Sequence, residues 1–295
     1  EMVIRDWSSD VCSSDLQPVQ SDTTLSRDDM ALVAKLVYEH AGIVIREHKE
    51  AMARGRLARR VKVLGLGSIA EYCAYLRTPA AVDEIPELIN AVTTNHTAFF
   101  RERHHFDHLR KDVLPRLIQE RAGRRGRIRI WSAACSSGEE PYSAAAISRD
   151  VIGHRSDLDF KILATDIDTD ILDRAAAGQY PAEQFDRLPA DLRPLLRLEG
   201  QSSRGEARIA EDLKRLIAFK RLNLIERWPM KGPFDVIFCR NVFIYFDTPT
   251  KAAILDRYVA LLQPGGFLYL GHSESLPQPH PQLRLIGRTI YERTP

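Results

Sequence analysis

The sequence predicts an α/β protein in which a small helical domain precedes a larger domain built on a parallel sheet. Residues 21–95 repeat helix-capping patterns, each followed by apolar residues at helical spacing. From residue 127 onward, short apolar runs alternate with amphipathic segments, as expected when a helix follows each parallel strand. A chain of 295 residues with 44% hydrophobic content can bury one large core and one smaller core.

The helical domain is expected to begin at a capping pattern. Ser26 precedes Asp29 by three residues, the spacing of a reciprocal cap at a helix N-terminus, and Ser68 with Glu71 repeats the pattern. This helix should run to about His40, with Gly42 ending it. Further helices are expected over residues 49–64, 68–76, 83–92 and 104–120.

The larger domain is expected to contain strands at residues 127–133, 160–166, 234–240 and 265–271, with helices at 139–152, 169–178 and 249–262. Residues 180–223 are less regular, and their short apolar runs suggest antiparallel strands. We interpret them as an inserted β subdomain, centred on residues 197–222. Residues 283–293 should form a closing hairpin.

Composition narrows the class of protein. A net charge of +2 gives no sign of a nucleic-acid binder, and the four scattered cysteines fit a reducing compartment. No run approaches the roughly 18 apolar residues of a membrane span, so a cytoplasmic protein without membrane insertion is expected. Residues 1–20 are rich in Ser and Asp and lack periodicity, which suggests a non-native leader or a disordered native tail.

Ligands of open parallel sheets bind beyond the carboxyl ends of the strands, so the loops there are the candidate site. The first loop, SAACSSGEEPYS, has small residues that permit close approach of a ligand. Glu139 and Glu140 fall in the first helical turn, where carboxylates would repel a pyrophosphate and attract a cationic ligand. Helix capping would explain them equally well. The loop also lacks the complete GxGxxG pattern of dinucleotide-binding proteins.

The later loops carry further polar side chains. Asp166 ends the second expected strand, where an acidic residue commonly binds the hydroxyls of a ribose. Asp168 and Asp170 are expected to cap the next helix instead. Asn223 and Asn241 also follow strands, and they are either strand caps or ligands of an adenine edge. Together these loops suggest a nucleoside ligand without a pyrophosphate.

Six segments in order resemble the CheR-type chemotaxis receptor methyltransferase family: NHTAFFR, WSAACSSGEEPYS, ATDID, FDVIFCRNVFIYF, LQPGGFLYLGHSES and the closing hairpin. The resemblance covers nearly everything from Leu25 onward. It implies a Rossmann-like S-adenosylmethionine-dependent methyltransferase domain, joined to a small N-terminal helical domain and carrying an inserted small β subdomain. It also implies S-adenosylmethionine as methyl donor, S-adenosylhomocysteine as product, and glutamate methyl esters on methyl-accepting chemotaxis receptors. The domains would span residues 21–95 and 96–295.

The resemblance also assigns site residues. It places Arg101 and Tyr245 nearest the reacting methyl group. Cys135, Ser136 and Ser137 depart from the family's usual small residues while keeping the loop's size, and no catalytic thiol is expected. The implied cofactor contacts are Asn95, Thr97, Arg101, Glu139, Asp166, Asn223, Leu224, Asn241 and Val242.

A glutamate acceptor explains why no catalytic base is apparent, because a carboxylate with a pKa of about 4.3 is already ionised at neutral pH. Arg101 is expected to orient carboxylates through its guanidinium fork. Receptor helices bearing glutamates are acidic, and a basic helix would attract them. The expected docking residues are Arg54, Arg56, Arg59, Arg60 and Lys62. A run of charged residues usually forms only a solvent-exposed helix face, which is the alternative interpretation.

Two alternatives remain open at this point. A nucleic-acid methyltransferase of the same fold could use the basic helix and the AGRRGR segment for phosphate contacts. A non-catalytic S-adenosylmethionine sensor would keep the donor pocket alone. His104, His105 and His108 share a helix with Phe106 and Leu109, and no metal site is expected from them.

Overall fold

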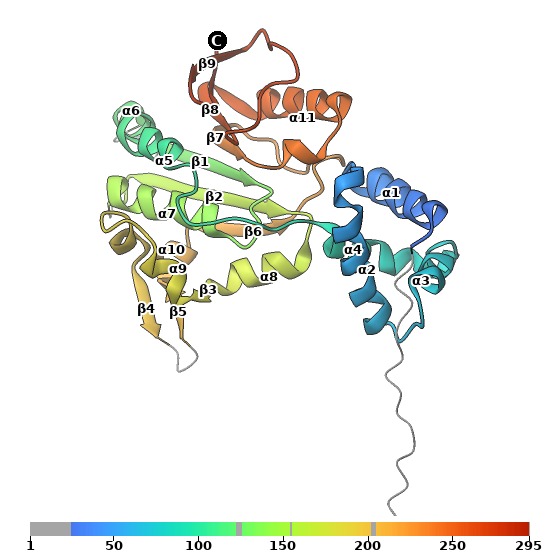
Figure 1. Cartoon of the computed structure of the whole chain (residues 1–295). Helices are drawn as coiled ribbons and strands as arrows, with labels where there is room; N and C mark the ends of the chain where they lie inside the picture. The colour runs from blue at the N-terminus through green and yellow to red at the C-terminus, as the bar shows by residue number, and fades with distance from the viewer. Residues whose placement is uncertain (1–24, 122–125, 154, 202–204, 295) are drawn as a thin grey trace, which may run out of the picture.

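A computed structural model describes residues 25–121, 126–153, 155–201 and 205–294. The expected leader, residues 1–20, lies outside the described residues. A helical domain and an α/β domain lie side by side (Figure 1). Among the described residues, no helix is long and apolar enough to cross a membrane.

The helical domain contains four helices: α1 (Arg27–Ala41), α2 (Glu50–Val63), α3 (Ile69–Leu76) and α4 (Glu84–Val92), with short 3-10 turns η1 (Glu47–Lys49) and η2 (Pro79–Asp83). The predicted caps are confirmed, since Ser26 Oγ accepts from the Asp29 amide and Ser68 Oγ from the Glu71 amide. Gly42 ends α1 at φ 70°, a conformation that favours glycine. The core contains Val33, Val37, Leu57, Val61, Tyr72 and Leu88.

The central sheet has seven strands in the order β6-β2-β1-β7-β8-β10-β9. The first five are parallel to one another, and β10 is antiparallel to both of its neighbours, β8 and β9. The chain builds outward from β1 in one direction and from β7 in the other, so the switch point lies between them. Their bounds are β1 (Gly126–Ala133), β2 (Leu158–Asp166), β6 (Ile217–Arg221), β7 (Phe234–Cys239), β8 (Leu262–Leu270), β9 (Leu283–Gly287) and β10 (Ile290–Arg293).

Alternate residues of the strands build two cores, one on each face of the sheet. Ile128 and Ile130 of β1 pack in the core that includes helix α7, whereas Trp131 and Ala133 pack with residues of α11. The predicted helix at 104–120 is continuous, with a π-helical segment η3 in its middle. The helices around the sheet are α5 (Arg103–His108), η3 (Leu109–Val113), α6 (Leu114–Arg121), α7 (Glu139–Ile152), α8 (Thr169–Ala177) and α11 (Thr248–Leu261).

The inserted subdomain is a three-stranded antiparallel sheet with the order β3-β5-β4. Its extent differs from the expected 197–222. The subdomain starts earlier, at β3, and β6 lies outside it. β6 pairs in parallel with β2 in the main sheet. An edge strand covered on one side has the same alternating pattern as a short antiparallel strand, which explains the error. The subdomain comprises β3 (Gln179–Pro181), α9 (Ala182–Asp186), η4 (Arg193–Leu196), β4 (Leu198–Gln201), β5 (Glu206–Ile209) and α10 (Glu211–Lys214).

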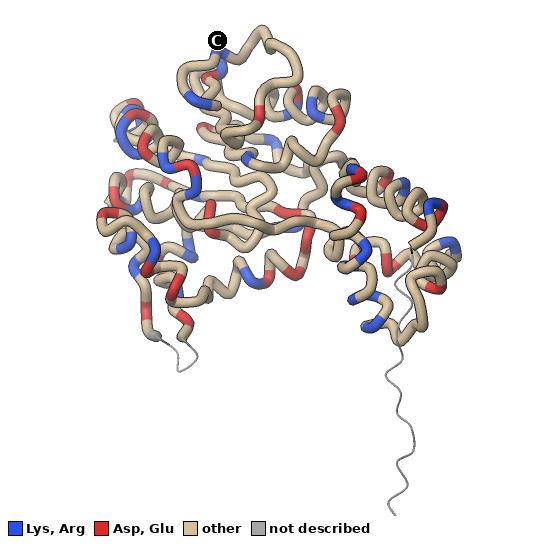
Figure 2. The backbone as a smooth tube through the Cα atoms, viewed as in Figure 1, with Lys and Arg blue, Asp and Glu red and all other residues tan. Residues whose placement is uncertain are grey.

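The predicted basic face of α2 is only partly exposed. Figure 2 shows Lys and Arg spaced along this helix. Arg60 turns toward α4, where Nε and Nη2 donate to the buried Glu84 carboxylate at 2.9 and 2.7 Å, and Nη1 contacts Glu87. Arg56 donates to carbonyl oxygens at the end of α4. The remaining three basic residues, Arg54, Arg59 and Lys62, are exposed.

Removal of the Arg60 side chain should destabilise the helical domain. Arg60→Ala would leave the Glu84 carboxylate, which is 5% exposed, without its cation, a loss expected to lower the free energy of unfolding by about 3 kcal/mol. Arg59→Ala, a change at an exposed position on the same helix, should have an effect below about 0.5 kcal/mol. Urea unfolding of both variants measures the difference, and equal effects would contradict a structural role for Arg60.

Candidate active site

A cavity of about 950 Å³, measured with its open mouth, lies at the carboxyl ends of the central strands. The helical domain forms part of its wall through Ala41, Ile43 and the end of α4. Segment 93–101, the start of α7 and the loops after β1, β2, β6 and β7 form the rest. The position agrees with the predicted strand-end site.

Nine of the ten predicted catalytic and cofactor-contacting residues line this cavity: Asn95, Thr97, Arg101, Asp166, Asn223, Leu224, Asn241, Val242 and Tyr245. Glu139 is not among the lining residues. Its buried carboxylate accepts from the Ser137 hydroxyl at 2.6 Å, and burial raises its pKa. The neighbouring Glu140 lines the cavity instead.

Asp166 lies at the end of β2, where two backbone amides hold its carboxylate. The Ser136 amide donates to Oδ2 at 2.7 Å and the Asp168 amide to Oδ1 at 3.1 Å. Asp168 caps α8 as predicted, accepting from the Ile171 amide. Burial raises the pKa of Asp166 to about 6. Each oxygen keeps a second acceptor position, so the carboxylate can accept from a pair of hydroxyl groups.

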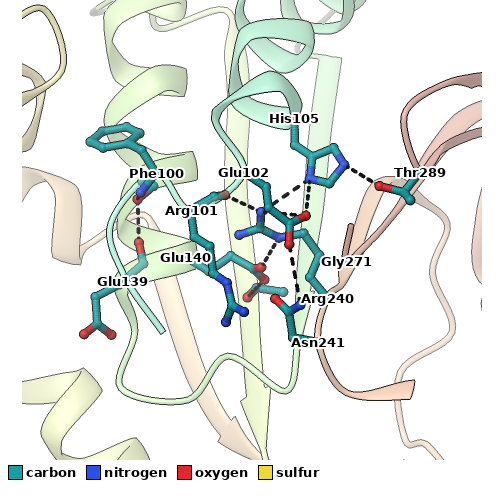
Figure 3. Close-up of polar contacts among 12 residues, drawn as sticks. Phe100, Arg101, Glu102, His105, Glu139, Glu140, Arg240, Asn241, Gly271 and Thr289 are labelled. Carbon is teal, nitrogen blue, oxygen red and sulfur yellow. Dashed lines mark hydrogen bonds and ion pairs between the residues drawn. The ribbon is translucent and has the colours of Figure 1, made fainter. Parts of the chain in front are cut away.

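Glu140 belongs to a buried polar cluster that sequence reasoning did not identify (Figure 3). Ser132 Oγ donates to one carboxylate oxygen at 2.6 Å, and Arg240 Nε donates to the other at 2.6 Å. Arg240 follows β7, so the pair spans the switch point of the sheet. The signals were present in GEEPYS and FCRN, but neither segment shows which charged residue faces inward.

The loop containing Asn241 is fixed by a second buried carboxylate, Glu274. Asn241 has a left-handed conformation, with φ 60°. Glu274 Oε2 accepts from the amides of Asn241 at 2.7 Å and Gly271 at 2.6 Å, and Oε1 accepts from Ile244 at 3.3 Å. The segment LGHSES, recognised only as part of the resemblance, therefore supports the cavity through its glutamate.

Two predicted cofactor residues also join the domains. The Asn95 side-chain amide donates to Asp168 at 2.7 Å. The Asn223 side-chain amide donates to the His40 carbonyl at the end of α1, at 2.6 Å, and to Glu226. Both asparagines line the cavity, but these donors are engaged within the protein. These hydrogen bonds therefore hold the segments that form the cavity wall in place.

Arg101 and Tyr245 lie on different segments of the cavity wall. Arg101 Nη1 donates to the His96 carbonyl at 2.9 Å, and the side chain is half-buried. The Tyr245 carbonyl accepts from the Val44 amide at 2.8 Å, and Lys49 Nζ lies 5.1 Å from the centre of the Tyr245 ring. The segment before α2 therefore borders the same side of the cavity as Tyr245.

A group of potential metal ligands lies near the cavity. Glu102, His104 and His105 place one ligand atom each within 4.8 Å of the others. The spacing of the histidines in the sequence did not indicate that Glu102 lies beside them. Arg240 Nη1 lies 3.3 Å from His105 Nδ1 and 3.8 Å from Glu102 Oε2. A guanidinium at this position disfavours a metal ion by like-charge repulsion.

The lining fits the predicted donor. Asp166 can accept from two hydroxyls, as a ribose requires, and it lies at the cavity wall. Among the described residues, the site shows no built-in phosphate cradle of glycine amides and lysine. The fold and the site together define a nucleoside-binding α/β enzyme of the S-adenosylmethionine-dependent methyltransferase class.

Comparison with known proteins identifies the family. The SAM binding domain of CheR methyltransferase matches residues 95–291, and the all-alpha domain of CheR methyltransferase matches residues 28–93. The chain belongs to the CheR methyltransferase family, which confirms the predicted resemblance, and its cofactor is S-adenosylmethionine.

Curated relatives match over most of their length. A probable chemotaxis protein methyltransferase of Rhizobium etli is 46% identical over 240 residues, covering 81% of this chain and 89% of the relative. Chemotaxis protein methyltransferase 2 of Pseudomonas aeruginosa is 43% identical, covering 90% and 93%. The chemotaxis protein methyltransferase of Escherichia coli is 40% identical, covering 88% of each chain.

Donor binding should depend on the ionisation of Asp166. Because burial raises its pKa to about 6, lowering the pH from about 7.5 to about 5.5 should weaken binding of S-adenosylhomocysteine about fourfold, as the ionised fraction falls. Titration calorimetry measures this, and Asp166→Asn should bind weakly at both pH values. Persistence of the full pH effect in that variant would exclude Asp166 as its source.

The stability of the ligand-free protein should change with pH in the opposite direction to donor binding. The folded Asp166 holds its proton more tightly than the unfolded residue, whose pKa is 3.8. Its contribution to the free energy of unfolding therefore falls as the pH rises from 3.8 toward 6. Wild type and Asp166→Asn can be compared by urea unfolding across this range.

Proposed function

We propose that the protein transfers a methyl group from S-adenosylmethionine to glutamate side chains of methyl-accepting chemotaxis receptors, forming methyl esters in the cytoplasm. This proposal rests on a difference in ion pairing between the two arginines in the cavity wall. Arg240 is paired with a buried glutamate. Among the residues that the structure describes, Arg101 forms no ion pair with a carboxylate, and its guanidinium donates only to the His96 carbonyl.

An uncompensated guanidinium at a half-buried position suits an incoming carboxylate. Its planar fork can donate two parallel hydrogen bonds to both oxygens, which orients the acceptor as well as attracting it. The relatives' names, chemotaxis protein methyltransferase, agree with an acidic protein substrate of the sensory system. Glutamate carboxylates on receptor helices combine both properties.

The reaction demands orientation more than proton transfer. S-adenosylmethionine supplies an electrophilic methyl group when bound. Arg101 orients the acceptor carboxylate, Tyr245 borders the reacting region, and the helical domain limits access of water. Alignment of reactants in this way can supply about 7 to 11 kcal/mol of rate acceleration. The absence of a Ser/His/Asp arrangement among the described residues of the cavity is consistent with this chemistry.

The exposed part of α2 is the proposed receptor-docking surface. It consists of Arg54, Arg59 and Lys62, with Arg56 and Arg60 excluded because they bind α4. α2 lies beside the cavity, since the Thr94 hydroxyl contacts the Met52 sulfur at 3.9 Å and Thr94 lines the wall. An acidic helix on this surface would therefore lie near the mouth of the site.

The nucleic-acid alternative is less well supported. Three arginines of the helix before AGRRGR are ion-paired: Arg110 with Asp150, Arg116 with Glu120 and Glu292, and Arg121 with Asp235. AGRRGR itself, residues 122–127, falls mainly on residues 122–125, outside the described residues. Phosphate binding needs a cluster of available cations, which this helix does not present among its described residues.

Methyl transfer should produce an alkali-labile product. Incubation with labelled S-adenosylmethionine and receptor-containing membranes should label the receptor, and mild alkali should release the label as volatile methanol, because carboxyl methyl esters hydrolyse readily. Membranes whose receptors carry Gln at the methylated positions serve as control. Alkali-stable label or label in RNA would contradict the proposal, and no label despite donor binding would support the sensor alternative.

Charge reversal on α2 should slow receptor methylation in a salt-dependent way. Combined replacement of Arg54, Arg59 and Lys62 by Glu should lower the rate about tenfold at low ionic strength, with a smaller effect at high salt. A matched control reverses three exposed cations elsewhere that pair with no described carboxylate: Lys111, Arg174 and Lys231. Equal loss in the control, or a loss that salt does not diminish, would place docking on another surface.

A further inference from the structure

We infer that Arg240 is a positioning residue that fixes the backbone of Arg101 and the side chain of Glu140 in the methyl-transfer site. The inference rests on the proposed function, because it concerns the same reaction. Arg240 comes directly after β7, and its side chain is only 2% exposed. It lies between the NHTAFFR segment and the start of α7, which reach the cavity from different parts of the chain (Figure 3).

Arg240 binds both segments with separate nitrogens. Nε donates to Glu140 Oε2 at 2.6 Å, and Nη1 donates to the Arg101 carbonyl oxygen. Glu102 Oε2 lies 3.8 Å from Nη1 and adds a second carboxylate. The charge of Arg240 is therefore compensated within the protein, so its effect on an acceptor carboxylate must pass through the groups that it holds.

The surroundings of Arg240 restrict its guanidinium to one place. Its centre lies 5.2 Å from the Phe106 ring and 5.7 Å from the Phe238 ring. His105 Nδ1 lies 3.3 Å from Nη1, and burial beside this cation lowers the pKa of His105 to about 3. The imidazole is thus neutral and can accept at Nδ1 while Nε2 contacts Thr289 Oγ1 at 3.1 Å.

Arg101 needs such a restraint because its backbone neighbours are strained. Phe100 and Glu102 have φ values of 53° and 58°, in the left-handed region that side chains other than glycine rarely adopt. The Phe100 amide donates to Ser143 Oγ at 2.9 Å on one side of Arg101. The Arg240 bond to the Arg101 carbonyl restrains the other side. Without it, the strained segment could relax and carry the Arg101 guanidinium away from the acceptor.

A double-mutant cycle tests this inference. Arg240→Met should lower kcat for receptor methylation about 100-fold at saturating donor, the scale expected for a misplacement of about 1 Å. Arg240→Lys, which keeps the charge but loses the fork, should give a partial loss. If Arg240 acts through Arg101, adding Arg101→Lys to Arg240→Met should cause little further loss, because coupled residues are not additive.

The control is Arg121→Met, which breaks an ion pair with Asp235 at the opposite end of β7. This change should destabilise the protein. At temperatures below the unfolding transition, kcat should stay at the wild-type value. Multiplicative effects of Arg240→Met and Arg101→Lys, or an equal kcat loss in Arg121→Met, would overturn the inference.

A second measurement is independent of the substrate. Hydrogen exchange of the amides at residues 100–102 should become faster in Arg240→Met and not in Arg121→Met. Unchanged exchange there would overturn the inference even if receptor methylation occurs. Faster exchange without methylation by the wild type would support the positioning role and contradict the proposed function.

Discussion

The site depends on a buried ion pair between Glu140 and Arg240 at the switch point of the sheet. A single buried carboxylate or guanidinium is costly, but together they satisfy each other and join the start of α7 to the loop after β7. The connections that follow the parallel strands β1 and β7 lead to opposite sides of the sheet, which leaves room for a ligand at this point. Both residues of the pair contribute to the wall of the cavity there.

The second requirement is the attachment of the helical domain across the strand ends. Tyr38 donates to Asp247 at 2.8 Å, the Asn223 amide binds the end of α1, and Asn95 binds Asp168. These contacts come from three separate loops of the sheet domain. Because α1 and α4 contribute walls, the cavity belongs to both domains, and a receptor on α2 would lie beside the donor instead of meeting it across open solvent.

Local sequence patterns predicted the elements well because their causes are local. The caps Ser26, Ser68 and Asp168 follow from three-residue spacings that a folded helix satisfies by itself. The choice between Glu139 and Glu140 has no such local signal, because successive helical residues point about 100° apart and the sheet's position decides which one faces inward.

Longer-range packing also decided which basic residues of α2 are exposed. Arg56 and Arg60 look like Arg54 and Arg59 in the sequence, but α4 lies against one side of the helix and binds them. The same limit applies to β6, whose parallel partner β2 lies far away in the chain. The roles of Arg240 and Glu274 likewise depend on partners that lie far away in the sequence, so local patterns could not predict them. The family resemblance located the segments, but not the orientation of these side chains.

The charges of the cavity explain how a wall with acidic residues can admit a carboxylate. Glu140 is compensated by Arg240, and the charge of Asp166 is directed at the amides of Ser136 and Asp168. Neither carboxylate presents an unbalanced field toward the mouth. Arg101 is the complementary case, since it has a carbonyl partner and no described carboxylate. An acidic acceptor would therefore be attracted to Arg101 and would meet balanced polar groups in the acidic part of the wall.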